Sequence, residues 1–169
     1  MKRILIYLSL VLSFISPTFG QQNAKSKTGE VASDFTFLDN KGKEHYMSDI
    51  EAQYIVLFFY NPDCEHCQKY LKSLKKDKLL ATYTKQKAVA VIAVAVETDQ
   101  EAFGANFFDL PIEWNKGFCE DCEEIIDHYL EKVPSIFVLD DIKMVIKSNI
   151  EPKELENFLK TISIEGMKL

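Results

Sequence analysis

Two pairs of cysteines with the same spacing are the residues that could carry chemistry in this sequence. Cys64 pairs with Cys67 and Cys119 pairs with Cys122, each enclosing two residues. A thiolate with this spacing attacks a partner disulfide, and the second thiol then displaces the partner from the mixed disulfide. The spacing also suits a structural disulfide or half of a zinc site. For the first pair, the surrounding sequence favours redox exchange.

The first pair follows a predicted buried strand and a turn. The run 54–60 is apolar, aromatic and β-branched without alternation, which is typical of a strand buried on both faces. A turn signal at 61–63 follows, and the spacing predicts an amphipathic helix over 64–80. A thiol at a helix start feels the positive end of the helix dipole, which favours its thiolate. We therefore expect Cys64 to be the nucleophile and Cys67 the resolving thiol.

The two residues between these cysteines are expected to tune their redox potential. His66, when protonated or as a hydrogen-bond donor, would stabilise the Cys64 thiolate and shift the pair toward an oxidant. Glu65 acts in the opposite sense, because a nearby negative charge disfavours the thiolate. The sequence therefore predicts redox chemistry without fixing the direction of electron flow.

Composition and the N-terminal pattern predict one exported domain. The 169 residues are 47% hydrophobic and 27% charged, as expected for a single folded unit. Basic residues at 2–3, an apolar run at 4–15 and small residues at 16–20 are typical of a signal peptide, and the run is shorter than a membrane span. The formal net charge is −6, and cleavage would remove two more basic residues, which argues against a nucleic-acid partner.

We divide the chain into a signal peptide at 1–20, a flexible polar leader at 21–30 and a single domain at 31–165. The mature protein is expected in the periplasm or cell envelope, where disulfides persist. We expect a monomer that meets the membrane only if the signal segment stays uncleaved.

Strand and helix patterns alternate along the predicted domain. A hairpin is predicted within 32–50, and strands separated by helices then imply a parallel pair. A turn at 140–141 implies a later antiparallel pair. The remaining predictions are strands at 89–96, 112–114, 135–139 and 144–148, and helices at about 100–108, about 119–130 and from Pro152 onward. The predicted fold class is α/β, with a central mixed sheet flanked by helices and an N-terminal β-hairpin extension.

These features together resemble the thioredoxin superfamily. The resemblance is carried by the signal peptide, the hairpin, the strand running into CxxC and Val133-Pro134. The start at 29–35 is similar to that of exported TlpA/ResA-like thiol-disulfide oxidoreductases and of the related peroxiredoxins. The peroxiredoxins need a hydroxyl residue ahead of the reactive cysteine, and this chain has none between Pro62 and Cys64. The resemblance implies a thioredoxin-like fold, a protein disulfide reductase or oxidase without a bound cofactor, and partner proteins with cysteines or disulfides.

In that superfamily a cis proline lies against the active-site cysteines. The resemblance therefore implies a cis bond before Pro134, with the backbone of Val133 beside Cys64 to bind the extended chain of a partner. An ordinary trans proline opening a strand is the alternative. The chain departs from its relatives at Phe58 and Tyr70, where some of them carry acids, so the resemblance does not identify a proton acceptor for the resolving cysteine.

The second pair begins another predicted helix, on the same predicted edge of the sheet as the first. Cys119 and Cys122 are interpreted as a structural disulfide, a second redox pair or metal ligands. Neighbouring acids raise the pKa of a thiol, which makes this pair the poorer nucleophile. The alternative function is a metal-binding or metallochaperone-like module of thioredoxin fold that uses Cys64, Cys67 and His66, with or without the second pair.

Overall fold

The centre of the fold is β3 (Tyr54–Tyr60), the apolar run that precedes the first CxxC pair. In the computed structural model, which describes residues 27–162, β3 pairs in parallel with β4 (Val89–Ala95). On its other side it pairs antiparallel with β6 (Ser135–Asp140). The β3 residues from Ile55 onward are at most 1% exposed, because both faces of the strand are covered. The prediction of a strand buried on both faces is confirmed.

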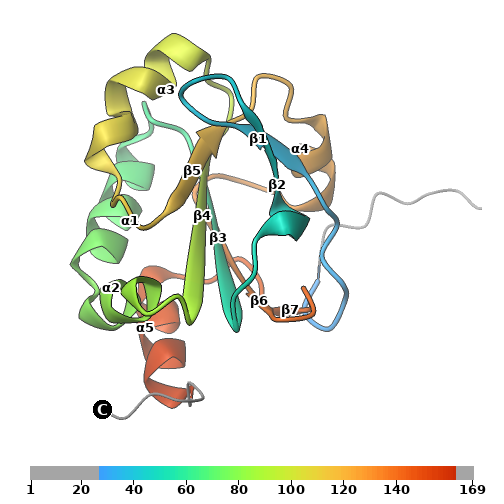
Figure 1. Ribbon diagram of the computed structural model, residues 1–169, viewed down its shortest axis with the longest axis vertical. Coiled ribbons are helices and arrows are strands. Elements are labelled where there is room, and N and C mark those ends of the chain that lie inside the picture. The colour runs from blue at the N-terminus through green and yellow to red at the C-terminus, as the bar shows by residue number, and fades with distance from the viewer. Residues whose placement is uncertain (1–26, 163–169) are drawn as a thin grey trace, which may run out of the picture.

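Seven strands form one mixed sheet in the order β2-β1-β5-β4-β3-β6-β7 (Figure 1). β5 (Asn115–Phe118) is parallel to β4, and β7 (Val145–Lys147) is antiparallel to β6. β1 (Thr36–Leu38) and β2 (Glu44–Tyr46) form the predicted antiparallel hairpin. The predicted mixed sheet with its N-terminal hairpin is therefore confirmed.

The hairpin is joined to the sheet rather than resting on it as a cap. β1 pairs antiparallel with β5 through Leu38 and Phe118. At Gly117 an added Cβ would lie 2.4 Å from the carbonyl oxygen of Leu38 and 2.5 Å from the Phe37 ring. Such distances are far below van der Waals contact, so glycine at this position permits the close approach of β1 to β5.

Helices cover both faces of this sheet. α1, α2 and α5 lie on one face, and α4 lies on the opposite face (Figure 1). α3 follows β4 and contacts β5. The helices are α1 (Glu65–Lys76), α2 (Lys78–Lys85), α3 (Gln100–Asn106), α4 (Glu123–His128) and α5 (Pro152–Thr161), with short 3-10 helices η1 (Met47–Asp49) and η2 (Phe107–Asp109).

The alternation of β3 divides the hydrophobic core into two clusters. Val56, Phe58 and Tyr60 belong to the first cluster, together with the buried stripe of α1. The intervening residues of β3 belong to the second cluster, which also contains Phe35 and the start of α4. Side chains of successive strand residues point to opposite faces, so the two clusters lie on the two sides of the sheet.

The single helix predicted over 64–80 is two helices in the structure. α1 ends at Lys76, and Asp77 has extended backbone angles. The Asp77 carboxylate accepts hydrogen bonds from the backbone N–H groups of Leu79 and Leu80, in the first turn of α2. Aspartate is a preferred N-cap residue because it satisfies such unpaired N–H groups. The prediction was wrong because it ran through Asp77, whose side chain caps a second helix with its own buried residues.

Two predictions near the second cysteine pair are also corrected. The strand predicted at 112–114 is a turn, Ile112 is 88% exposed, and β5 begins at Asn115. The helix predicted from Cys119 begins at Glu123, after Cys122 as its N-cap. The strand is displaced because pairing with β4 and β1, rather than the local apolar pattern, determines where β5 starts and ends. The helix is shorter because the chain leaving β5 reaches Cys122 before the first helical turn begins.

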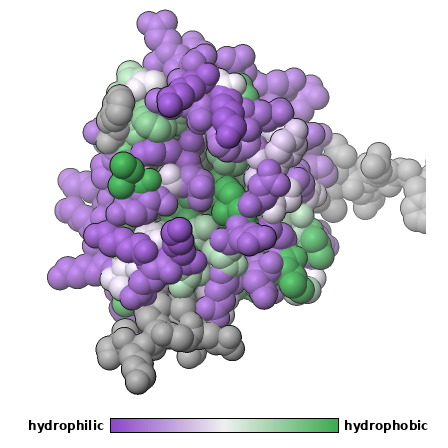
Figure 2. All heavy atoms as spheres, viewed as in Figure 1, coloured by the Kyte–Doolittle hydropathy of each residue, from purple (hydrophilic) through white to green (hydrophobic). Residues whose placement is uncertain are grey.

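The described part of the chain begins within the predicted leader. The N–H of Gly29 donates to the carbonyl oxygen of Val145, and the N–H of Val145 donates to the carbonyl oxygen of Glu30. Gly29 and Glu30 are therefore hydrogen-bonded to β7. The predicted signal peptide lies outside the described residues. Within 27–162 no helix is long and apolar enough to span a bilayer. The face in Figure 2 is mainly hydrophilic, with scattered hydrophobic spots.

Candidate active site

A turn after β3 holds Cys64 at the start of α1. The N–H of Asp63 donates to the side-chain oxygen of Asn61 at 2.8 Å, and the N–H of Cys64 donates to the Asn61 carbonyl at 3.2 Å. Cys64 is the N-cap of α1, and its sulfur accepts from the N–H of Cys67 at 3.3 Å. The Asn-Pro-Asp turn therefore aims the first thiol at the positive end of the helix.

This position favours the thiolate of Cys64. The pKa of Cys64 lies below its ordinary value, chiefly because the Cys67 thiol hydrogen-bonds to it and then because of the Cys67 backbone N–H. The backbone N–H of His66 acts in the same direction, whereas the Glu65 carboxylate opposes it. Cys64 is also partly exposed, so an incoming disulfide has access to its sulfur.

Cys67 is in the opposite situation, because its side chain is fully buried in the first cluster. Burial, followed by the hydrogen bond with the Cys64 thiol, raises the pKa of Cys67 to about 12. The N–H of Asn61, 3.5 Å from the Cys67 sulfur, lowers it in part. The two thiols are thus chemically unequal: Cys64 is partly exposed with a lowered pKa, and Cys67 is buried with a raised pKa. Their predicted roles remain predictions that this inequality supports.

The residues between the cysteines are both exposed. Glu65 forms an i,i+4 ion pair with Lys69 at 3.5 Å, and both side chains are largely in solvent. The His66 ring lies 4.9 Å from the Tyr70 ring. The contribution of His66 to the Cys64 thiolate in the structure comes from its backbone N–H, so tuning by the His66 ring remains a prediction.

The loop before β6 has the predicted proline geometry. The bond between Val133 and Pro134 is cis. Ser135 follows it and pairs with Phe59 near the end of β3, so the loop lies at the sheet edge from which the chain continues to Cys64. The Ser135 hydroxyl lies 2.6 Å from the carbonyl oxygen of Lys132, which ties the loop together. Val133 packs against both clusters. Its predicted contact with a partner chain is not tested by these observations.

The second CxxC pair is joined by a disulfide in the structure. Cys119 and Cys122 are 4% and 5% exposed and lie between β5 and α4. Because β3, β4 and β5 run in parallel, this pair is at the same edge of the sheet as Cys64, as predicted. It packs into the second cluster, however, whereas Cys67 belongs to the first. The two pairs therefore face opposite sides of the sheet.

This arrangement bears on the three interpretations of the second pair. Burial of both sulfurs fits a structural disulfide better than a pair that exchanges with partners. Among residues 27–162, no three or more His, Cys, Asp or Glu side chains converge to hold a metal ion. The ligand set suggested for the metal-binding alternative is therefore not assembled in the described part of the chain.

Sequence reasoning missed a contact behind the first pair. The Tyr70 hydroxyl donates to the Glu151 carboxylate, which belongs to the N-cap residue of α5. Tyr70 is buried, and burial together with this hydrogen bond raises its pKa above the ordinary value. The two residues are 81 positions apart, so no local pattern connects them.

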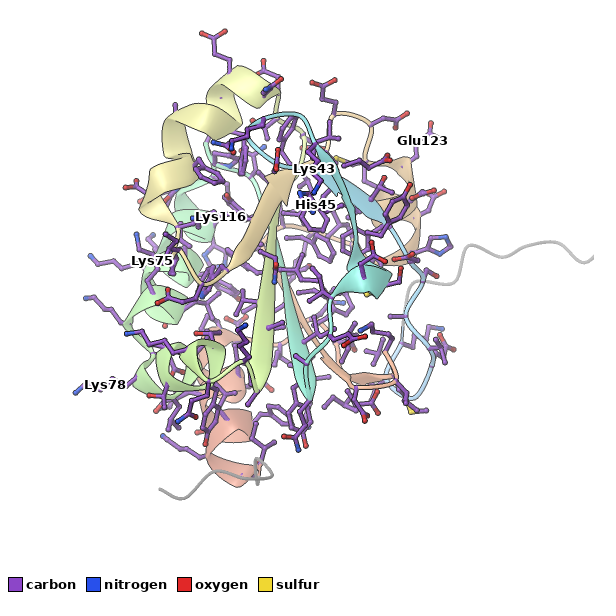
Figure 3. The ribbon with its side chains drawn as sticks, viewed as in Figure 1. Lys43, His45, Lys75, Lys78, Lys116 and Glu123 are labelled. Atoms are coloured by element: carbon purple, nitrogen blue, oxygen red, sulfur yellow. A yellow bond between two sulfur atoms is a disulfide. The ribbon has the colours of Figure 1, made fainter. Side chains whose placement is uncertain are left out.

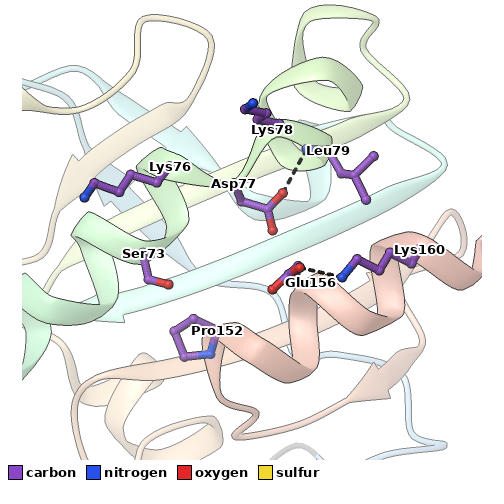
Figure 4. Close-up of a pocket in the computed structure, with 8 residues that line it drawn as sticks. All are labelled: Ser73, Lys76, Asp77, Lys78, Leu79, Pro152, Glu156 and Lys160. Carbon is purple, nitrogen blue, oxygen red and sulfur yellow. Dashed lines mark hydrogen bonds and ion pairs between the residues drawn. The ribbon is translucent and has the colours of Figure 1, made fainter.

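Lysines occupy the solvent-facing side of α1 and α2. Lys75 and Lys78 extend outward from the molecule (Figure 3), as expected of a solvated face. A pocket of about 390 Å³ between α1, α2 and α5 is lined partly by lysines (Figure 4). The Asp77 carboxylate caps α2 there, and the Glu156 carboxylate pairs with the Lys160 ammonium at 2.5 Å. Both acidic groups in the pocket are thus already engaged by other groups of the protein. The pocket does not contain either cysteine pair.

Comparison with known proteins agrees with this fold. A family model described as the AhpC/TSA family matches residues 28–109. A curated relative, the thiol-disulfide oxidoreductase ResA of Geobacillus kaustophilus, is 25% identical over 170 residues, which cover 94% of this chain and 91% of the relative.

Two solved structures share the fold. A thioredoxin-like protein from Bacteroides caccae has a TM-score of 0.77 at 22% identity, over 82% of this chain and 51% of that one, so this chain spans about half its length. A thiol:disulfide interchange protein from Bacteroides sp. has a TM-score of 0.69 at 20% identity, over 85% of this chain and 93% of that one. The predicted thioredoxin-like fold is therefore confirmed. In sequence the chain is similar to the ResA thiol-disulfide oxidoreductases along nearly its whole length, and its fold is thioredoxin-like.

Proposed function

We propose that the protein exchanges disulfides with partner proteins of the cell envelope through Cys64 and Cys67. The observation that carries the proposal is the inequality of the two thiols: Cys64 is accessible with a lowered pKa, and Cys67 is buried with a raised pKa. A reactive thiolate beside a protected thiol is what a two-step exchange requires. The names of the relatives support the same chemistry.

In the reducing direction, the Cys64 thiolate attacks one sulfur of a partner disulfide. A Cys64–partner disulfide forms, and the other partner sulfur leaves as a thiolate that takes up a proton. Cys67 then loses its proton and attacks the Cys64 sulfur, which releases the second partner thiol. The partner gains two electrons and two protons, and the Cys64–Cys67 pair becomes a disulfide. Oxidation of a partner is the same sequence in reverse.

The Val133-Pro134 loop is proposed to bind the partner during this exchange. The proposal is supported by the pairing of Ser135 with Phe59, which lies at the sheet edge from which the chain continues to Cys64, and by Val133, which packs against the same cluster as Cys64. The backbone groups of Val133, which form no hydrogen bond among the described residues, would pair with an extended segment of the partner, as a strand adds to a sheet edge.

Variants of the two cysteines test the proposal. Cys64→Ser is expected to abolish reduction of a disulfide-bonded protein substrate, and Cys67→Ser is expected to accumulate the mixed disulfide, seen as a band on a non-reducing gel. The double variant Cys119→Ser/Cys122→Ser is the matched control, and its exchange is expected to stay at the wild-type rate. Wild-type activity in Cys64→Ser would overturn the proposal.

The location in the cell envelope is proposed from the N-terminal pattern and from the ResA-like relatives. Sequencing the N-terminus of the protein from fractionated cells tests it. The expected mature protein begins at Gln21 and is found outside the cytoplasm, whereas an intact Met1 in the cytoplasmic fraction would contradict it.

A further inference from the structure

The hydroxyl of Tyr60 is buried at the end of β3 without a hydrogen-bond partner. Tyr60 is 1% exposed. Among the side chains that the structure describes, its hydroxyl is the buried polar atom left unpaired. Burying a hydroxyl without a partner is unfavourable, so such a group in a folded protein calls for an explanation.

Cys67 lies close to the end of β3 at which Tyr60 stands, because the N–H of Asn61, the next residue, is 3.5 Å from the Cys67 sulfur. Tyr60 shares the first cluster with Cys67, and its ring stacks on Phe58 with centroids 5.1 Å apart. Burial, followed by the negative charge that Cys67 carries as a thiolate, raises the pKa of Tyr60 above its ordinary value. Tyr60 therefore keeps its proton at neutral pH and remains a hydrogen-bond donor.

Cys67 has few other donors. The described groups that act on it are the Cys64 thiol and the N–H of Asn61, the latter at the long distance of 3.5 Å. Tyr70 also faces it from α1, but the Tyr70 hydroxyl already donates to Glu151, with Glu154 nearby on α5. Tyr60 is thus the neighbouring hydroxyl that is not engaged.

We propose that Tyr60 is a positioning residue for the second step of the exchange, in which its hydroxyl donates a hydrogen bond to the Cys67 thiolate. This inference rests on the proposed function. The hydroxyl keeps its own proton, and no bond to Tyr60 forms or breaks. The proton of Cys67 leaves to solvent, the thiolate is stabilised while it attacks the Cys64 sulfur, and the partner sulfur departs as a thiolate.

Tyr60→Phe removes the donor and retains the stacked ring. Loss of one hydrogen bond to a charged group should reduce the thiolate fraction of Cys67 about tenfold. The more basic thiolate is about threefold more nucleophilic, so the second step should slow by about threefold at neutral pH. The pH profile of that step should move to higher pH, whereas attack by Cys64 should not change.

The two steps are separated by mixing the reduced protein with excess dithiobis(nitrobenzoic acid) in a stopped-flow instrument. Attack by Cys64 releases the first coloured thiolate at a rate that depends on reagent concentration, and attack by Cys67 releases the second at a rate that does not. Tyr60→Phe is expected to slow only the second phase. Equal slowing of both phases, or an unchanged second phase, would overturn the inference.

Tyr83→Phe is the matched control. Tyr83 is 5% exposed in the same cluster, and its hydroxyl donates to the Leu159 carbonyl at 3.4 Å, with no contact to the cysteines among those described. Both of its phases are expected at the wild-type rates. Tyr60→Leu also lacks a donor and serves if Tyr60→Phe does not fold, as judged by circular dichroism. If the wild-type protein itself showed no second phase, the proposed function would fail; a normal wild type with an unaltered Tyr60→Phe removes only this inference.

Discussion

Replacing glycine by alanine is expected to have opposite effects on the free energy of unfolding at Gly117 and at Gly104. At Gly117 in β5, the new Cβ would lie 2.4 Å from the Leu38 carbonyl oxygen and 3.1 Å from its carbonyl carbon. These are backbone atoms, so β1 must move and its pairing through Leu38 and Phe118 weakens. At Gly104 in α3, nothing lies within 4 Å of the added carbon.

The magnitudes follow from these surroundings. Overpacking typically costs about 1–3 kcal/mol, and a clash with backbone belongs in the upper half of that range. We expect Gly117→Ala to lose about 2 kcal/mol of unfolding free energy, which lowers the melting temperature by roughly 4–8 °C in a domain of this size. Alanine is the better helix former, so Gly104→Ala should gain about 0.5–1 kcal/mol.

Thermal unfolding followed by circular dichroism, with urea titration for the free energies, measures both changes. Cys64 lies in none of β1, β5 and α3. In both variants its reaction with dithiobis(nitrobenzoic acid) should therefore proceed at the wild-type rate. A wild-type melting temperature for Gly117→Ala would refute the close approach of β1 to β5. A comparable loss in Gly104→Ala would show that the effect is not specific to that approach.

Two further outcomes concern the cysteines. At pH 7 iodoacetamide should label Cys64 in the reduced protein and leave Cys67 intact, because the pKa of Cys64 is lowered while the Cys67 thiol stays protonated until the pH nears 12. Cys67→Ala removes the hydrogen bond to Cys64 and should move the pH dependence of Cys64 labelling to higher pH. Peptide mass mapping at each pH measures the labelling of both cysteines, and earlier labelling of Cys67 would contradict the assignment. Replacing Cys119 and Cys122 by serine opens a disulfide loop with a sequence separation of 3, which should lower the free energy of unfolding by about 2 kcal/mol. Urea titration measures this loss. Equal stability of the reduced and the oxidised wild-type protein would argue against a structural disulfide.

The central part of this fold could be predicted from local sequence. The continuous apolar run of β3, the turn after it and the CxxC spacing each specify their structure within a few residues. The cis bond at Pro134 was predicted as well, although from resemblance rather than from local pattern. The roles assigned to Cys64 and Cys67 remain predictions that their environments support.

The errors arose where distant parts of the chain decide the structure. β5 contains Asn115, Lys116 and Gly117, which have little strand preference, and it forms because β4 and β1 pair with it on both sides. The division between α1 and α2 is an exception, because it depends on a local cap at Asp77 that the sequence interpretation overlooked. The unpaired hydroxyl of Tyr60 could not be recognised before its neighbours were placed.

Val133 touches the hydrophobic clusters on both sides of the sheet, although it stands in a loop rather than in a strand. A side chain anchored in two packed layers has little freedom to shift toward either one. We therefore expect the loop to keep the same conformation before and after a partner binds. Recognition of a partner chain by this loop would need little ordering of the protein itself, so the entropic cost of binding would fall mainly on the partner.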